Sequence, residues 1–295
     1  MYIVSYRRQG PWRAGVVHDA LLVDAGALNP ASKGNPYTVK GLLEAGTANV
    51  DIVLQFARRA FANAENGLIS IEDVEIGPPV PDPDKIICLG LNYREHATEL
   101  QMGVAKVPTL FAKFRNALCG PDSYIILPKV SAQIDYEGEL TVVIGRRCKD
   151  VSELEALTCV AGYTIMNDVS ARDLQMQTSQ WTAGKTLDSF APTGPGIVPA
   201  SDIPDPQRLQ ITTRVNGVIL QQGNTCDMIF PVNFTIAFLS SLMTLEPGDL
   251  IATGTPSGVG FKRRPPVFLK VGDVVEVEIE RIGVIRNQVV GTSRL

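Results

Sequence analysis

The sequence predicts an α+β fold, with a large, mainly β C-terminal domain over residues 85–295 and a small N-terminal α+β domain over residues 1–77. Two observations support this prediction. Short apolar runs typical of strands outnumber helical patterns, and they do not alternate regularly with helices as a parallel β/α sheet requires. The stretch from 77 to 84 contains four prolines, which favour extended chain and separate the two parts.

The N-terminal part begins with three short apolar runs joined by turns that contain glycine or aspartate, a pattern typical of a β-meander. The runs cover residues 2–6, 14–17 and 20–24. Two helices are expected next. The first begins at Thr38, and the second continues to Phe61 with Asn49 or Asp51 as its N-cap.

The C-terminal part alternates irregularly between strand and helix patterns. The expected strands are 85–90, 124–127, 134–145, 160–166, 210–215, 218–221, 250–253 and 275–279. The expected helices are 94–103, 152–159, 171–177 and one within 227–243. The dipeptide Asn216-Gly217 is the type I′ turn signal of a β-hairpin. Glycine stops the helix at Gly103.

Composition excludes several classes of function. The chain has 295 residues and a net charge of −4, so it offers no basic face for nucleic acid. No apolar run approaches the roughly 18–20 residues that span a bilayer, so no membrane association is expected. The five cysteines are widely spaced without a Cys-x-x-Cys pair, which favours a reducing compartment. We expect a cytoplasmic protein.

Two glutamates interrupt an apolar strand pattern in the middle of the chain. Side chains alternate between the faces of a strand, so Glu137 and Glu139 share one face across Gly138. Unpaired buried carboxylates are costly, which predicts either protonation or a bound cation. Asp168 ends the next apolar run and is a candidate third ligand. An all-oxygen set of this kind suits Mg²⁺ or Mn²⁺ better than Zn²⁺.

Lys185 follows Asp168 by 17 residues and supplies one positive charge. Three carboxylates, one divalent cation and one ammonium would then be neutral together. The alternative from spacing alone is two surface glutamates on an edge strand and an aspartate that caps a helix.

A His-x-x-Glu pair lies on the predicted helix 94–103. His96 and Glu99 are three residues apart, the spacing at which a carboxylate can orient an imidazole on one helix face. A structural surface pair has the same spacing. Lys113 and Arg115 are basic and close to the acidic stretch in sequence, and the simpler interpretation for both is solvated surface.

Four motifs in this order resemble the fumarylacetoacetate hydrolase superfamily, from about Lys85 to the C-terminus. They are Tyr136-Glu-Gly-Glu-Leu140, Asn167-Asp-Val-Ser-Ala-Arg-Asp173, Gly184-Lys-Thr-Leu-Asp188 and Gly254-Thr-Pro-Ser-Gly-Val-Gly260. Within the superfamily, the chain resembles bacterial acylpyruvate hydrolases, oxaloacetate decarboxylases and hydroxyhepta-dienedioate isomerases.

The resemblance implies roles for individual residues. Glu137, Glu139 and Asp168 would bind Mg²⁺, with Mn²⁺ or Ca²⁺ as alternatives, and Lys185 would help to hold the substrate. His96 and Glu99 would form a catalytic pair on a lid-like helix. Gln175 and Thr255 match positions that contact substrate. Some members use an extra aspartate near Asn92, and asparagine there implies a three-carboxylate site. A homodimer is also implied.

The function expected from this resemblance is Mg²⁺-dependent hydrolysis of a carbon–carbon bond in a 2,4-dioxo acid, such as an acylpyruvate or fumarylpyruvate, with release of pyruvate. His96 would activate the water and Glu99 would orient His96. The same site could instead decarboxylate oxaloacetate, or isomerise or decarboxylate 2-hydroxyhepta-2,4-diene-1,7-dioate. A binding protein that keeps the fold without turnover is the alternative from another class.

Overall fold

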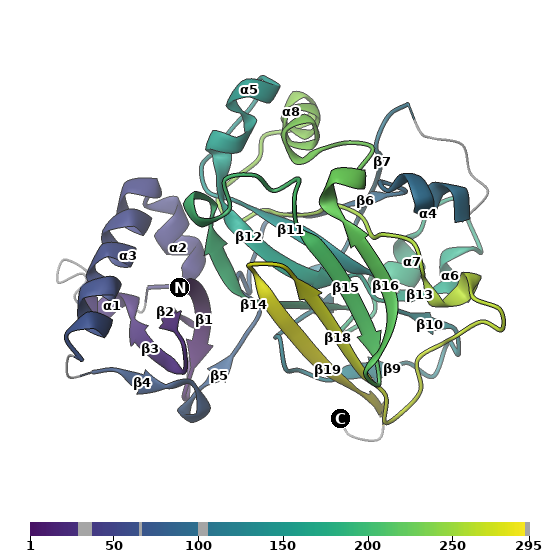
Figure 1. Cartoon of the computed structure of the whole chain (residues 1–295), viewed down its shortest axis with the longest axis horizontal. Helices are drawn as coiled ribbons and strands as arrows, with labels where there is room; N and C mark the ends of the chain where they lie inside the picture. The colour runs from purple at the N-terminus through teal and green to yellow at the C-terminus, as the bar shows by residue number, and fades with distance from the viewer. Residues whose placement is uncertain (29–36, 65–66, 100–105, 293–295) are drawn as a thin grey trace.

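The computed structural model describes residues 1–28, 37–64, 67–99 and 106–292 (Figure 1). It contains helices and strands with strands in excess, and most strand pairs are antiparallel, so the predicted α+β class is confirmed. Within these residues no helix combines the length and the apolar character needed to cross a lipid bilayer.

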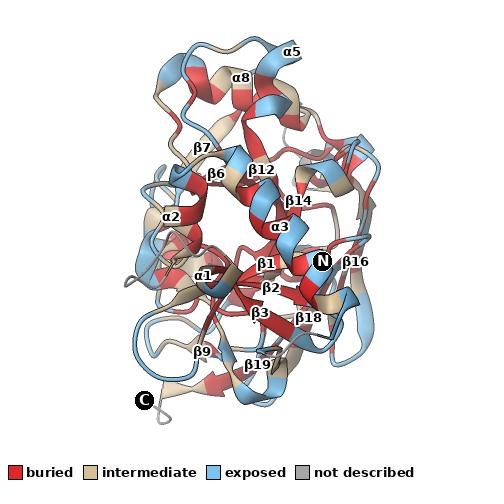
Figure 2. Ribbon diagram, turned by 90° about the vertical axis from the view of Figure 1, so that its left-hand side faces the viewer, coloured by how far each residue is buried: buried red, intermediate tan, exposed pale blue. Residues whose placement is uncertain are grey.

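The N-terminal part is a β-meander covered by helices. Its elements are β1 (Tyr2–Arg7), β2 (Arg13–His18), β3 (Leu21–Asp24), α1 (Ala25–Leu28), α2 (Val39–Glu44), α3 (Thr47–Ala62), β4 (Ile69–Ser70) and β5 (Glu75–Ile76). The buried faces of α2 and α3 pack against β1 and β2, while the outer face of α3 is exposed (Figure 2).

The start of α2 agrees with the sequence prediction, but the start of α3 does not. The Thr38 side chain accepts a hydrogen bond from the Gly41 N–H and caps α2. Helix α3 begins at Thr47 after Gly46, which has a φ of 97°. Asn49 does not act as the N-cap, because its amide donates to the Ala45 carbonyl at 2.6 Å from inside the helix.

The C-terminal part contributes most of the strands. They are β6 (Ile86–Gly90), β7 (Thr109–Ala112), β8 (Leu118–Cys119), β9 (Ile125–Leu127), β10 (Ile134–Asp135), β11 (Gly138–Ile144), β12 (Val160–Asn167), β13 (Ser170–Ala171), β14 (Ala191–Pro199), β15 (Gln210–Val215), β16 (Val218–Asn224), β17 (Leu250–Ala252), β18 (Val274–Ile279) and β19 (Gly283–Gly291). The helices are α4 (Arg94–Glu99), α5 (Glu153–Ala156), α6 (Arg172–Gln175), α7 (Thr182–Lys185) and α8 (Val232–Leu242). The predicted stop of the first helix at Gly103 lies outside the described residues.

In the C-terminal part a smaller sheet packs face to face on a larger one, which extends into the N-terminal part. The larger has 12 strands, with the main order β4-β3-β2-β1-β14-β12-β11-β17-β6-β7, and the smaller has the order β16-β15-β18-β19-β9. The smaller sheet lies across β11 and β12 (Figure 1), and their shared core includes Leu140, Tyr163, Ile211, Val277 and Ile285. Alternating burial along β18 follows its predicted apolar and acidic alternation.

The two parts of the chain share one sheet. Strand β1 pairs antiparallel with β14, and Ile3 lies opposite Ile197. The predicted division near residue 77 stays a prediction, and the sheet shows that the N-terminal part is joined to the larger part by backbone pairing.

Candidate metal and substrate site

Three buried carboxylates meet at the centre of the larger part. One oxygen each from Glu137, Glu139 and Asp168 can be chosen so that all three lie within 4.8 Å of one another. Asp168 follows the end of β12, which pairs with β11, so the strand register brings the acids together. The structure thus places the three predicted ligands in one cluster.

The strand that carries the glutamates differs from the predicted continuous one. It breaks at residues 136 and 137 between β10 and β11. The Glu137 N–H donates to Asn167 Oδ1 at 3.0 Å, and the Asp168 N–H donates to the Glu137 carbonyl at 2.8 Å. These bonds replace regular strand pairing, and they hold Glu137 beside Asp168.

Lys185 lies between two of the three acids. Its Nζ is 2.6 Å from Glu137 Oε2 and 2.6 Å from Asp168 Oδ2, and its side chain is buried. Burial alone would lower the pKa of Lys185, but the charges of Asp168 and Glu137 outweigh burial and raise this pKa. The predicted association of Lys185 with the acidic cluster is therefore present.

Arg172 is a second buried cation, and sequence reasoning assigned it no role. Its Nε lies 2.9 Å from Asp135 Oδ2, its Nη2 lies 2.7 Å from Glu137 Oε1, and its guanidinium lies 4.3 Å from the centroid of the Phe261 ring. Burial acts to raise the pKa of Glu137, but Arg172 and Lys185 outweigh burial and hold that pKa below its usual value.

Lys113 corrects the sequence interpretation, which put it on the solvated surface. It is only 2% exposed, and its Nζ lies 2.7 Å from Asp168 Oδ1. The same ammonium donates to the carbonyls of Val169 and Lys185. Phe111, two residues earlier, lines the pocket. Period-two alternation from Phe111 was the available signal that Lys113 points inward. Arg115 is exposed, as expected.

Glu139 is the least compensated member of the cluster. It is 1% exposed and its Oε2 accepts the Gly254 N–H at 2.8 Å, but among the described residues no cation forms an ion pair with it. Burial and the neighbouring charges of Asp168 and Glu137 raise the pKa of Glu139 well above its usual value. A hard divalent cation with oxygen ligands fits this excess of negative charge.

The predicted pair on α4 is formed. His96 is 4% exposed, and its Nδ1 lies 3.1 Å from Glu99 Oε2. The Glu99 carboxylate also accepts the Gly258 N–H, at 3.2 Å to Oε1, and Glu95 accepts the Ser257 hydroxyl at 3.1 Å. Two acidic residues therefore hold α4 against the turn 254–260, and Glu99 alone of the two also contacts His96.

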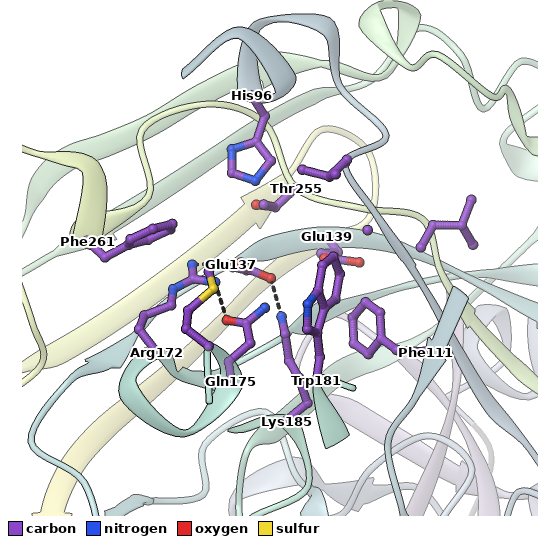
Figure 3. Close-up of a pocket in the computed structure, with 14 residues that line it drawn as sticks. His96, Phe111, Glu137, Glu139, Arg172, Gln175, Trp181, Lys185, Thr255 and Phe261 are labelled. Atoms are coloured by element: carbon purple, nitrogen blue, oxygen red, sulfur yellow. Dashed lines mark hydrogen bonds and ion pairs between the residues drawn. The ribbon is translucent and has the colours of Figure 1, made fainter. Parts of the chain in front are cut away.

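A pocket of about 150 Å³ lies between His96 and the acidic cluster. Figure 3 shows His96 on the side opposite Lys185 and Gln175, with Phe111 and Trp181 on one flank and Arg172 and Phe261 on the other. The pocket is lined by Leu89, Gly90, Leu91, His96, Phe111, Glu137, Glu139, Arg172, Gln175, Met176, Trp181, Lys185, Thr255 and Phe261.

Both predicted substrate-binding residues line this pocket, but their polar atoms already have partners. Gln175 Oε1 accepts from Arg172 Nη1 at 3.0 Å, so the amide nitrogen is the end of Gln175 that remains as a donor. The Thr255 hydroxyl donates to the Gly138 carbonyl at 3.0 Å and accepts from Gln221 Nε2 at 2.8 Å. Their contact with substrate stays a prediction.

Asn92 forms hydrogen bonds with the backbone around the site. Its amide nitrogen donates to the carbonyls of Phe230 and Thr253, and its oxygen accepts the Phe230 N–H at 2.7 Å. This side chain is fully buried. The bonds fix the turn after β6, where Leu91 has a φ of 61°, and this turn leads directly into α4.

Sequence reasoning did not single out the aromatic residues of the site or Asp135. Asp135 is buried and accepts hydrogen bonds from the backbone of Gly260 and Phe261. It therefore fixes the loop that carries Phe261 to the pocket. A lone aspartate two residues before Glu137 gave no spacing signal for this role.

Comparison with known proteins identifies the class. Residues 85–290 match the family model described as "Fumarylacetoacetate (FAA) hydrolase C-terminal". Because this match covers more than half of the chain, the protein belongs to the fumarylacetoacetate hydrolase family, and it is an enzyme.

Individual relatives are similar over most of their length. The chain is 46% identical to the mitochondrial oxaloacetate tautomerase Fahd2a of Rattus norvegicus, over 91% of this chain and 84% of that protein. The solved fumarylacetoacetate hydrolase of Exiguobacterium antarcticum is 34% identical with a TM-score of 0.80, over 99% of both chains. The maleylpyruvate hydrolase of Sphingobium sp. SYK-6, solved with manganese(II) and pyruvate, is 29% identical with a TM-score of 0.80, over 99% of both chains.

Proposed function

We propose that this protein catalyses the metal-dependent enol–keto tautomerisation of a short 2-oxo acid, with oxaloacetate as the substrate. The observation that carries the proposal is the position of His96, whose buried imidazole faces the carboxylate cluster across a small pocket. The name of the relative that is 46% identical over 91% of the chain supports oxaloacetate.

The charges of the site support an anionic substrate. Four buried acids, Asp135, Glu137, Glu139 and Asp168, surround three buried cations, Lys113, Arg172 and Lys185, which leaves one net negative charge when His96 is neutral. Glu137, Glu139 and Asp168 would hold Mg²⁺ or Mn²⁺, which makes the site positive and supplies Lewis-acid stabilisation of negative charge at the 2-oxo oxygen. A dicarboxylate then enters with favourable electrostatics.

The size of the pocket supports a small substrate. A cavity of roughly 150 Å³ holds a six-carbon ring, whereas drug-sized ligands occupy roughly 300–1,000 Å³. The pocket here measures about 150 Å³. A four-carbon acid suits this space better than a fumaryl or longer acyl derivative of pyruvate.

His96 and Glu99 supply the proton chemistry. In the enol-to-keto direction, the enol hydroxyl loses one proton to water, and the adjacent carbon gains one proton from His96. The water then passes the proton that it received to His96. Glu99 Oε2, 3.1 Å from Nδ1, orients the imidazole. Lys185 and the amide of Gln175 face the same space and would orient the acid.

Hydrolysis of a short acylpyruvate is the second candidate, because the same pair can activate water for attack on a distal carbonyl. The maleylpyruvate hydrolase with bound pyruvate supports this candidate. Oxaloacetate decarboxylation and dienedioate isomerisation need the same acidic cluster and remain weaker alternatives.

One set of assays tests these candidates. The metal-loaded protein is mixed with enol-oxaloacetate and followed by the ultraviolet absorbance of the enol, while coupled assays measure pyruvate release from oxaloacetate and acetylpyruvate. We expect rapid loss of the enol without equivalent pyruvate release, inhibition by EDTA, and recovery with Mg²⁺ or Mn²⁺. Pyruvate release from acetylpyruvate that exceeds tautomerisation would favour the hydrolase instead.

A further inference from the structure

We infer that Trp181 limits the length of the 2-oxo acid that the pocket accepts. The residue closes the apolar side of the pocket together with Gly90, Leu91 and Phe111, and we call these four residues the apolar wall. The inference rests on the proposed function for the choice of substrate class, 2-oxo acids, and it deepens that function by naming the residue that selects among them.

The Trp181 ring occupies space that a side chain at position 90 would need. A Cβ added to Gly90 would lie 2.7 Å from Trp181 Cη2, well inside van der Waals contact. Gly90 is the last residue of β6 and is buried in the sheet. The Trp181 ring therefore packs directly on the backbone of β6, and it cannot move further toward that strand.

Phe111 supports the ring from a second side. The two ring centroids are 5.4 Å apart with an interplanar angle of 62°, an edge-to-face arrangement. Lys185 Nζ lies 4.8 Å from the centroid of the same Phe111 ring. Phe111 therefore contacts both the Trp181 ring and the ammonium that contacts the acidic cluster.

The backbone sets the distance between the wall and the reacting groups. Trp181 immediately precedes α7, and Lys185 ends it, so the two residues are one helical turn apart. Four residues of helix advance about 6 Å along the axis. The backbone therefore brings the Trp181 ring and the Lys185 ammonium to the lining of the same pocket.

The short helix that carries both residues has no room to shift. A Cβ added to Gly184 would lie 2.6 Å from the Ala171 carbonyl oxygen and 2.6 Å from the Gln175 nitrogen, so α7 packs directly against the start and end of α6. Asn116 Nδ2 also donates to the Thr186 carbonyl at 2.9 Å. The position of Trp181 is therefore fixed relative to Lys185.

The chemistry of the wall indicates the kind of extension that it stops. The side chains of Leu91, Phe111 and Trp181 are apolar, whereas Arg172 lies on the opposite flank of the pocket (Figure 3). A longer alkyl or acyl chain would be compatible with this wall in polarity but would collide with the Trp181 ring. Shortening this side chain should therefore admit longer acids.

Binding measurements test the inference without relying on turnover. Isothermal titration calorimetry compares pyruvate, 2-oxobutyrate, 2-oxopentanoate and 2-oxohexanoate with the Mg²⁺-loaded wild type and Trp181→Ala. We expect the affinity of the wild type to fall at the longer acids. Trp181→Ala should bind 2-oxohexanoate at least about 10-fold more tightly than the wild type does, because one methylene in a pocket changes discrimination between ligands by roughly 10–200-fold. Trp181→Leu serves if Trp181→Ala does not fold. The control Phe114→Ala removes an exposed aromatic side chain outside the pocket.

A double-mutant cycle tests the contact itself. Gly90→Ala should force the Trp181 ring to move and weaken binding of all four acids by about 10-fold or more, while in the Trp181→Ala background it should change affinity less than about twofold. The same chain-length dependence in wild type and both Trp181 variants, or equal effects of Gly90→Ala in both backgrounds, would overturn the inference.

The two proposals fail in different ways. A wild type that shows the predicted chain-length dependence but does not tautomerise enol-oxaloacetate would refute the proposed function and leave the role of Trp181 intact. A wild type that tautomerises enol-oxaloacetate while Trp181→Ala keeps the wild-type length dependence would refute the role of Trp181 alone.

Discussion

Lys113 and Lys185 contact opposite oxygens of the same carboxylate, Asp168. Lys113 Nζ lies 2.7 Å from Oδ1 and Lys185 Nζ lies 2.6 Å from Oδ2, and all three side chains are buried. Lys185 also lines the pocket. Lys113 is not among the lining residues, and it contacts Asp168 and two backbone carbonyls. The two lysines therefore have different roles: Lys113 holds the acid in place, and Lys185 presents charge to a ligand.

Lys113→Met should destabilise the fold. The substitution leaves Asp168 Oδ1 without its ion-pair partner and removes the donor to the carbonyls of Val169 and Lys185. Breaking a buried pair costs about 3–5 kcal/mol. Urea unfolding of the metal-free protein measures this free energy. Exposed Arg115, two residues away, provides the control Arg115→Met, which should stay within about 0.5 kcal/mol of wild type. Equal stability of the two variants would contradict the role of Lys113.

Glu139→Gln should weaken metal binding strongly while the fold persists. The amide oxygen of glutamine can still accept the Gly254 N–H, but the negative charge is lost. We expect Mg²⁺ and Mn²⁺ affinity, measured by calorimetry, to fall more than the roughly 10–100-fold cost of removing a group that only orients a ligand.

Glu137→Ala and Asp168→Ala should abolish metal binding too, because each removes one of three clustered oxygen donors. Exposed Glu72→Gln is the matched control for loss of one charge. If two of the three site variants kept wild-type metal affinity, the metal would have to bind at another site.

Asp24 should make the stability of the N-terminal part depend on pH in the acid range. Burial acts to raise its pKa, but hydrogen bonds from Arg13 and Tyr6 outweigh burial and lower it. A lowered folded-state pKa gives stability that is present above the unfolded value of about 3.9 and is lost as pH falls below it. Urea unfolding between about pH 5 and pH 2 should therefore show a shallower decline for Asp24→Asn than for wild type.

At neutral pH the same Asp24→Asn substitution should cost roughly 1.5–3 kcal/mol, the range for hydrogen bonds to a charged group. Exposed Asp51→Asn should keep the wild-type slope in acid. Identical slopes for the two variants would show that Asp24 does not contribute.

The acidic site could be predicted from sequence because its residues lie in or directly beside strands with regular patterns. Glu137 and Glu139 flank one glycine, and Asp168 ends the neighbouring strand, so pairing of β11 with β12 brings them together. Even there the break at residue 137 was not predicted, since it depends on the hydrogen bond from Glu137 N–H to Asn167, which comes from another strand.

The walls of the pocket could not be predicted in the same way. Trp181 meets Gly90 across about 90 positions of sequence, and their contact depends on how α7 packs against α6 and β7. Lys113 shows the same limit, because a lysine after a short strand reads as solvated until the acid that it pairs with is placed beside it. Local patterns specify elements, whereas these contacts come from tertiary packing.

Substitutions of His96 and Glu99 should distinguish a role in proton transfer from a role in holding α4 against the turn 254–260. His96→Ala should slow tautomerisation of enol-oxaloacetate about 10²–10⁴-fold, the usual cost of a lost acid–base group, and should slow oxaloacetate decarboxylation much less, because loss of CO₂ itself needs no proton transfer to carbon. Glu99→Gln should have the same effect more weakly, since it removes the charge 3.1 Å from the imidazole.

Glu95→Gln is the matched control, because Glu95 holds α4 through Ser257. Enol absorbance and pyruvate release measure the two reactions. Equal losses in Glu95→Gln and Glu99→Gln, or equal losses of both reactions in His96→Ala, would mean that the pair acts through closure of α4 or through a step common to both reactions.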